Sequence, residues 1–111
     1  MDIRVVFRGM DHSDAIETYI ADEVENKLFK FLQKEDDLVH LDVVLDAGRI
    51  HAHHHVEMRL RSKHYHFTAH HEGPDLYAVI DHVLKIVVED VKKQKDRMIS
   101  ERNHGGLPDV E

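Results

Sequence analysis

Four cationic side chains are gathered in a short stretch near the end of the chain, where they could bind phosphate. Lys92, Lys93, Lys95 and Arg97 follow a run of apolar residues spaced for a helix, which opens with Gly-Pro-Asp at 73–75. Ammonium and guanidinium groups bind phosphate through charge-assisted hydrogen bonds. The same cations are also stabilising at the negative, C-terminal end of a helix dipole. Taken alone, they therefore indicate an ordinary solvent-exposed helix end.

The chain as a whole is acidic, with a net charge of −7 over 111 residues. Proteins that coat nucleic acid non-specifically need many cations, because their affinity grows with the number of phosphates neutralised. The charge balance therefore excludes that class, predicts no DNA binding and confines any RNA contact to a local patch.

Twelve histidines offer a second kind of chemistry. Imidazoles at alternate positions of a strand, or opposite each other on two strands, could share a zinc, copper or nickel ion. The ordinary pKa of imidazole is about 6.5, so such a face could instead gain charge on acidification, and protonation of all 12 would turn the net charge of −7 into +5. The third interpretation is that these histidines are neutral polar side chains on a solvent-exposed sheet face. We expect no resident cofactor. The side chains expected on one outward face are His53, His55, His64, His66 and His70, with His51 in line.

Groups suited to catalysis are few. The chain has no cysteine, and Ser13, Ser62 and Ser100 fit a helix cap, a turn and a helix end better than a nucleophile beside a base. Asp42 and Asp46 share a strand face, but acids spaced this way on exposed strands are common and usually inert. We therefore expect neither an enzyme nor a protein with a small-molecule substrate.

The periodicity of apolar residues predicts four strands and two helices. Apolar and polar residues alternate in the strands, whereas apolar residues recur every three or four positions in the helices. The expected strands are 3–8, 40–46, 55–61 and 64–70, and the expected helices are 13–33 and 74–100.

Two of these strands, 55–61 and 64–70, are expected to form a hairpin with a turn at 62–63. In that register Arg61 faces His64, and the apolar and polar sets stay on opposite faces. On the apolar side we expect the rings of Phe31, Tyr65, Phe67 and Tyr77 in the core, with His54 and His71 at its margin.

This order of elements predicts an α+β fold of two layers, βαβββα, in which two helices cover one face of a four-stranded sheet. We expect a single domain over 1–102 and a flexible C-terminal tail over 103–111, where Gly105, Gly106 and Pro108 occur. The absence of cysteine and of a long apolar run favours a protein of the cytoplasm that does not enter membranes. We also expect it to be a monomer.

The segment Gly73-Pro74-Asp75-Leu76-Tyr77-Ala78-Val79-Ile80-Asp81 resembles the motif that opens the last helix in the ribosome hibernation-promoting factor family, which includes ribosome-associated inhibitor A. The family pattern is Gly-x-Asp-x-Tyr-x-Ala-Ile-Asp, and Val79 replaces its alanine. Together with the order of elements, the resemblance covers about residues 1–97.

The resemblance implies a fold like that of double-stranded-RNA-binding domains, and a stress or stationary-phase factor. Such a factor binds the small ribosomal subunit and its RNA, blocks the channel of messenger and transfer RNA, and so inhibits translation. This chain stops before the second, dimerising domain of long family members and so resembles a short form. The side chains implied to contact ribosomal RNA are Lys27, Lys30, Lys85, Lys92, Lys93, Lys95 and Arg97.

One departure weakens the RNA interpretation. Where close family members often carry arginine, this chain has Glu17, Glu23 and Glu89. Two other functions therefore stay open on the same fold: a histidine-rich domain that senses metal or pH, and a protein-interaction module that has lost affinity for ribosomes.

Overall fold

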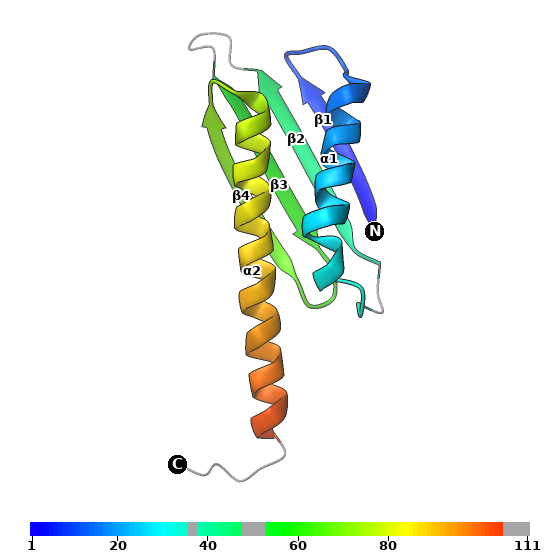
Figure 1. The fold of residues 1–111 in the computed structure, drawn as a ribbon, viewed down its shortest axis with the longest axis vertical. Coiled ribbons are helices and arrows are strands. Elements are labelled where there is room, and N and C mark those ends of the chain that lie inside the picture. Colours follow the sequence, from blue (N-terminus) through cyan, green and yellow to red (C-terminus); the bar gives the residue numbers. More distant parts are fainter. Residues whose placement is uncertain (36–37, 48–52, 106–111) are drawn as a thin grey trace.

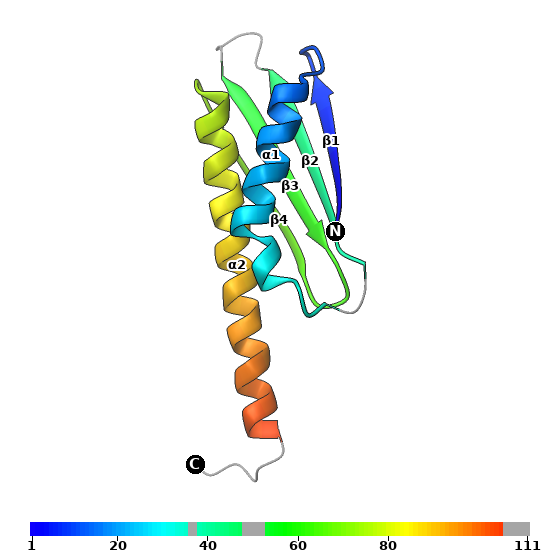
Figure 2. The ribbon, with the colours of Figure 1, turned by 45° about the vertical axis from the view of Figure 1, so that its right-hand side comes forward.

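The computed structural model describes residues 1–35, 38–47 and 53–105, with side chains as far as Glu101. Four strands form one sheet in the order β1-β2-β3-β4, in which β1 is parallel to β2 and the other pairs are antiparallel. Both long helices lie on the same face of this sheet, and the C-terminal half of α2 extends beyond it (Figures 1 and 2). The elements are β1 (Asp2–Arg8), α1 (Asp14–Lys27), the 3₁₀ helix η1 (Phe29–Phe31), β2 (His40–Ala47), β3 (His54–Arg61), β4 (His66–Gly73) and α2 (Leu76–Gly105).

The core lies between the sheet and the helices, as the alternation of apolar residues predicts. Successive strand side chains point to opposite faces, so every second residue of β2 and β3 is buried under the helices. The helices contribute one apolar stripe each. The expected α+β class and βαβββα order are therefore confirmed. The fully enclosed side chains include Leu41, Val43, Leu45, Val56, Met58 and Leu60 from the sheet, and Ile20, Val24, Ile80, Val83 and Val87 from the helices.

The predicted register of the hairpin is wrong by two residues. Arg61 pairs with His66 rather than His64, so the connection between β3 and β4 has four residues. Within this loop the Ser62 amide donates to the Tyr65 carbonyl at 2.8 Å, and the Tyr65 amide donates to Ser62 Oγ at 3.2 Å. Tyr65 is thereby turned into the core, where it is 3% exposed.

A carboxylate from a distant segment anchors that loop. Ser62 Oγ donates to Glu35 Oε1 at 2.9 Å, and His64 Nδ1 lies 3.0 Å from Glu35 Oε2. The wider loop is stabilised by these contacts because they satisfy polar groups that a two-residue turn would leave to water. Because the register is shifted by an even number of residues, the side chains of both strands lie on the faces of the sheet that were predicted.

The ends of both helices differ from the expected positions. Ser13 caps α1 as predicted, with its Oγ accepting from the Ile16 amide at 3.2 Å, but α1 ends at Lys27 and a 3₁₀ turn follows. At the start of α2, Asp75 accepts hydrogen bonds from the amides of Tyr77 and Ala78 at 3.1 and 3.4 Å, and so acts as the N-cap.

The second helix also runs past its expected end at residue 100 and includes 103–105, which the sequence assigned to the tail. The remainder of the expected tail, 106–111, lies outside the described residues, and the division into a domain and a tail stays a prediction. None of the helices in the described ranges is long and apolar enough to cross a membrane.

Candidate nucleic-acid interface

A groove of about 450 Å³ runs between the end of α1, η1 and α2. Four of the seven cations expected to contact RNA line it, although they come from segments more than 50 residues apart. Val88 and the ring of Phe31 provide its apolar lining. The four cations are Lys27, Lys30, Lys85 and Lys92, and the groove also contains the carboxylates of Asp81 and Glu89.

Two carboxylates beside this groove are already engaged. Glu23 Oε1 lies 2.7 Å from Lys27 Nζ, and this hydrogen bond raises the pKa of Lys27. Asp81 Oδ1 accepts from the Tyr19 hydroxyl at 2.5 Å, which together with burial and the charge of Asp81 raises the pKa of Tyr19 well above its ordinary value.

The remaining lysines of the groove keep their charge available. Within the described part of the chain, Lys30, Lys85 and Lys92 form no ion pair, and all three side chains are exposed. Like charges held close together in a concave surface raise the local potential and attract a polyanion. Lys30, Lys85 and Lys92 therefore place three positive charges around the groove, beside the carboxylates of Asp81 and Glu89.

The other three predicted cations lie outside the groove lining. Lys95 is next to it, since its Nζ lies 3.5 Å from the carbonyl oxygen of Phe31. Lys93 and Arg97 are roughly 80° and 120° around the helix from Lys85, at 100° a residue. Arg97 donates to Gln94 Oε1 at 2.9 Å. The predicted cluster is therefore divided between two sides of α2.

The acidic replacements noted in the sequence fall in different places. Glu17 lies at the start of α1, where His12 Nε2 is 2.6 Å from its Oε2. Glu23 pairs with Lys27, and only Glu89 of the three lines the groove. Glu89 is therefore the one replacement of the three that adds a negative charge to the groove lining.

One aromatic residue was assigned wrongly to the core. Tyr77 is 43% exposed and packs edge-on against Tyr19, with ring centroids 4.8 Å apart. Phe31 is half-buried rather than enclosed, whereas Tyr65 is buried as predicted. Helical phase could not have indicated this for Tyr77, because at 100° a residue it lies only about 60° around the helix from the buried Ile80.

The histidines do not form the single row that the sequence suggested. His55 and His70 lie on the outward face of the sheet, with ring centroids 5.6 Å apart, and His66 is at the other end of β4. His64 is in the loop beside Glu35, whereas His53 Nδ1 lies 3.7 Å from Glu72 Oε2. His51 lies outside the described residues.

A metal site gains no support from this arrangement. The described ranges contain no group of three or more His, Cys, Asp or Glu side chains placed to hold a metal ion. A histidine pair that the sequence did not suggest is formed between β4 and α2, where the rings of the exposed residues His71 and His82 are 4.0 Å apart. His54, which the sequence placed at the core margin, is half-buried, and its Nδ1 is buried with no hydrogen-bond partner among the described residues.

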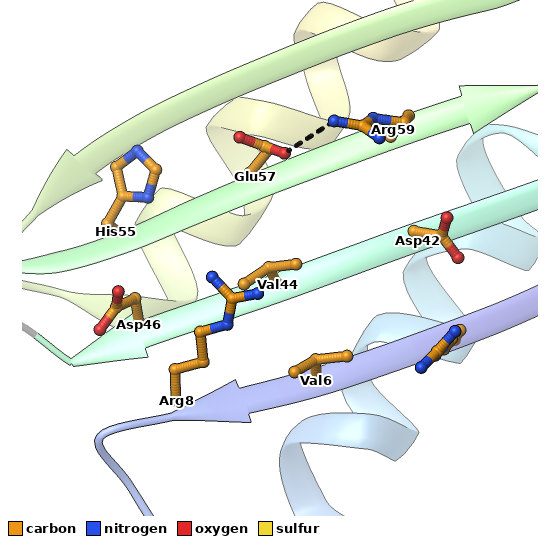
Figure 3. A pocket seen from close by; sticks show the side chains of 9 residues that line it. Val6, Arg8, Asp42, Val44, Asp46, His55, Glu57 and Arg59 are labelled. Atoms are coloured by element: carbon orange, nitrogen blue, oxygen red, sulfur yellow. Dashed lines mark ion pairs between the residues drawn. The ribbon is translucent and has the colours of Figure 1, made fainter.

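The outward face of the sheet is hollowed, with a volume of about 430 Å³. Figure 3 shows Arg8 reaching from β1 towards Val44 of β2, with Asp46 and His55 nearby and an ion pair between Glu57 and Arg59. Opposite charges alternate here, so this face lacks the concentration of one sign that the groove has.

The fold and the groove together define a class: a two-layer α+β domain that carries a cationic groove between its two helices. The chain belongs to the sigma 54 modulation protein / S30EA ribosomal protein family, whose model matches residues 3–99. Membership of the hibernation-promoting factor family, expected from the motif at 73–81, is thereby confirmed.

Two solved structures are similar to this one. The N-terminal domain of Protein Y from Thermus thermophilus is 26% identical, with a TM-score of 0.68 over 84% of this chain and 98% of that one. A ribosomal subunit interface protein from Coxiella burnetii is 16% identical, with a TM-score of 0.65 over 86% of this chain and 99% of that one, which shows a shared fold. Among curated protein sequences, none matches this chain significantly.

Proposed function

We propose that this protein is a non-catalytic factor that binds the small ribosomal subunit through its RNA and blocks the channel of messenger and transfer RNA. In stress or stationary phase such binding silences translation and keeps ribosomes in hibernation. The protein acts in the cytoplasm as a monomer. The family of the chain and the 26% identity to a Protein Y domain support the assignment.

The observation that carries the proposal is the groove between the helices. Lys27 and Lys30 line one side of this groove of about 450 Å³, and Lys85 and Lys92 line the other. Phosphate contacts of this kind dominate affinity for nucleic acids. Lys93, Lys95 and Arg97 would extend the contact along the part of α2 that projects beyond the sheet (Figure 1).

The test is co-sedimentation with purified small subunits over a series of salt concentrations. Each phosphate contact contributes about 0.7 to 0.9 to the slope of log affinity against log salt, so four contacts predict a loss of about 50- to 150-fold between about 50 and 200 mM salt. Replacing Lys85 and Lys92 by Glu should lower that slope by about 1.4 to 1.8.

Lys63→Glu is the matched control, because Lys63 is an exposed lysine in the loop between β3 and β4 and does not line the groove. Lys63→Glu changes the net charge by the same amount per substituted residue, and it should leave the slope of log affinity against log salt unchanged. An absence of sedimentation at low salt, or equal losses in the groove and control variants, would contradict the proposal. Displacement by excess transfer RNA would separate binding in the channel from binding elsewhere on the subunit.

A further inference from the structure

Three lysines from two separate helices converge on one aromatic residue. Lys30 Nζ lies 5.4 Å from the centroid of the Phe31 ring, and Lys92 Nζ lies 5.8 Å from the same centroid. Lys95 Nζ is 3.5 Å from the Phe31 carbonyl oxygen. Phe31 is the last residue of η1, the short turn that follows α1.

Such a convergence needs an attractive contact. Exposed lysine side chains are flexible and repel one another, so without a partner their ammonium groups spread into water. An aromatic ring supplies that partner, because the negative face of its quadrupole attracts a cation within about 6 Å. The backbone carbonyl supplies a second one for Lys95.

From these contacts we infer that Phe31 is a positioning residue, which holds Lys30, Lys92 and Lys95 together as one binding site for the phosphates of an RNA strand. The inference rests on the proposed function, since it identifies the part of the groove that recognises the phosphate backbone. An ammonium group above the ring can contact a phosphate on its open side, so the ring contacts are kept when RNA binds. The ring therefore contributes to affinity by bringing the cations together beforehand.

A neighbouring residue provides the matched control. Phe29 belongs to the same 3₁₀ turn and is 39% exposed, but its ring lies in a different hollow together with Met1 and Leu38. Phe29→Leu removes an exposed ring of the same size from the same element without touching the lysines. A general effect of losing an aromatic ring from η1 would appear equally in both variants.

The first arm of the experiment needs no RNA. A cation above a ring is shielded by the ring current, so the ε-CH₂ protons of Lys30 and Lys92 should resonate upfield in the wild type. They should return to ordinary shifts in Phe31→Leu and stay upfield in Phe31→Tyr and Phe29→Leu. Unchanged lysine shifts in Phe31→Leu would overturn the inference whatever the ribosome assay shows.

The second arm measures affinity for a 12-nucleotide single-stranded RNA by fluorescence anisotropy at low salt. Two weak cation–ring contacts at exposed positions predict a loss of about three- to tenfold in Phe31→Leu, with affinity retained in Phe31→Tyr and Phe29→Leu. Equal affinities of Phe31→Leu and wild type, or no binding by the wild type, would overturn the phosphate site.

Replacement of Phe31 by pentafluorophenylalanine separates the electrostatic role from packing. This ring has almost the same shape but a reversed quadrupole, so it should keep the melting temperature and lose the affinity. Full affinity with the fluorinated ring would refute the role given to Phe31. RNA binding without sedimentation on small subunits would instead count against the proposed function alone.

Discussion

The hydrogen bond between Tyr19 and Asp81, a residue that lines the groove, joins α1 to α2, and its removal has a calculable effect. The Tyr19 hydroxyl donates to Asp81 Oδ1 at 2.5 Å, and both residues are half-buried. A hydrogen bond to a charged group contributes about 1.5 to 3 kcal/mol when it is shielded from water. Since water can reach Asp81 in the variant, we expect Tyr19→Phe to cost about 1 kcal/mol, or roughly 4 to 8 °C in melting temperature.

The pH dependence of this difference identifies its cause. The hydrogen bond to Asp81 raises the pKa of Tyr19 in the folded protein above the unfolded value, which is about 10. The stabilisation is therefore fully present below about pH 10 and is lost as the pH rises further through the folded pKa. The free energies of unfolding of wild type and Tyr19→Phe should differ by a constant amount between about pH 7 and 9, and should converge above about pH 10.

Urea denaturation at a series of pH values provides the assay. Burial and Glu35 also raise the pKa of Tyr65, but that contribution is common to both proteins and cancels in the difference. Tyr77→Phe is the control, because among the described residues the Tyr77 hydroxyl has no hydrogen bond. Equal stability of wild type and Tyr19→Phe at pH 8, or a difference that persists at high pH, would refute the reasoning.

Two further predictions concern packing and the groove. Gly73→Ala places a Cβ 3.1 Å from Val79 Cγ2, so it should cost about 1 kcal/mol in urea denaturation, and the same change should cost less in a Val79→Ala background. Glu89→Gln should raise the RNA affinity about two- to fivefold at low salt, and no change would mean that this carboxylate lies outside the bound strand's reach.

The sequence was sufficient to predict the two layers of the fold, because apolar residues recur with one period in the strands and with another in the helices. Alternation in β2 and the three-and-four spacing in α2 each define one buried side, and two such sides can only be covered by each other. The hairpin register was not accessible in the same way. A shift of two residues leaves the alternation unchanged, so the outcome depends on Glu35, which lies 27 residues from Ser62 in the chain.

The candidate site was predictable in its residue types but not in its shape. Charge and family resemblance identified all four lysines of the groove. The roughly 100° between successive helical residues would also have indicated that Lys92 and Lys93 point to different sides of α2. The role of Phe31 could not be foreseen, because it depends on where α1 gives way to η1. That boundary decides which side chains of η1 face α2.

An acidic chain presents a cationic groove because four lysines line it against two carboxylates, Asp81 and Glu89. The pair between Glu23 and Lys27 cancels one charge of each sign. Asp81 stays negative, because the Tyr19 hydroxyl that donates to it is neutral. The net charge of −7 therefore says little about what the groove binds, since the potential at a site depends on the nearest charges and the rest of the chain is screened beyond about 8 to 10 Å at physiological salt.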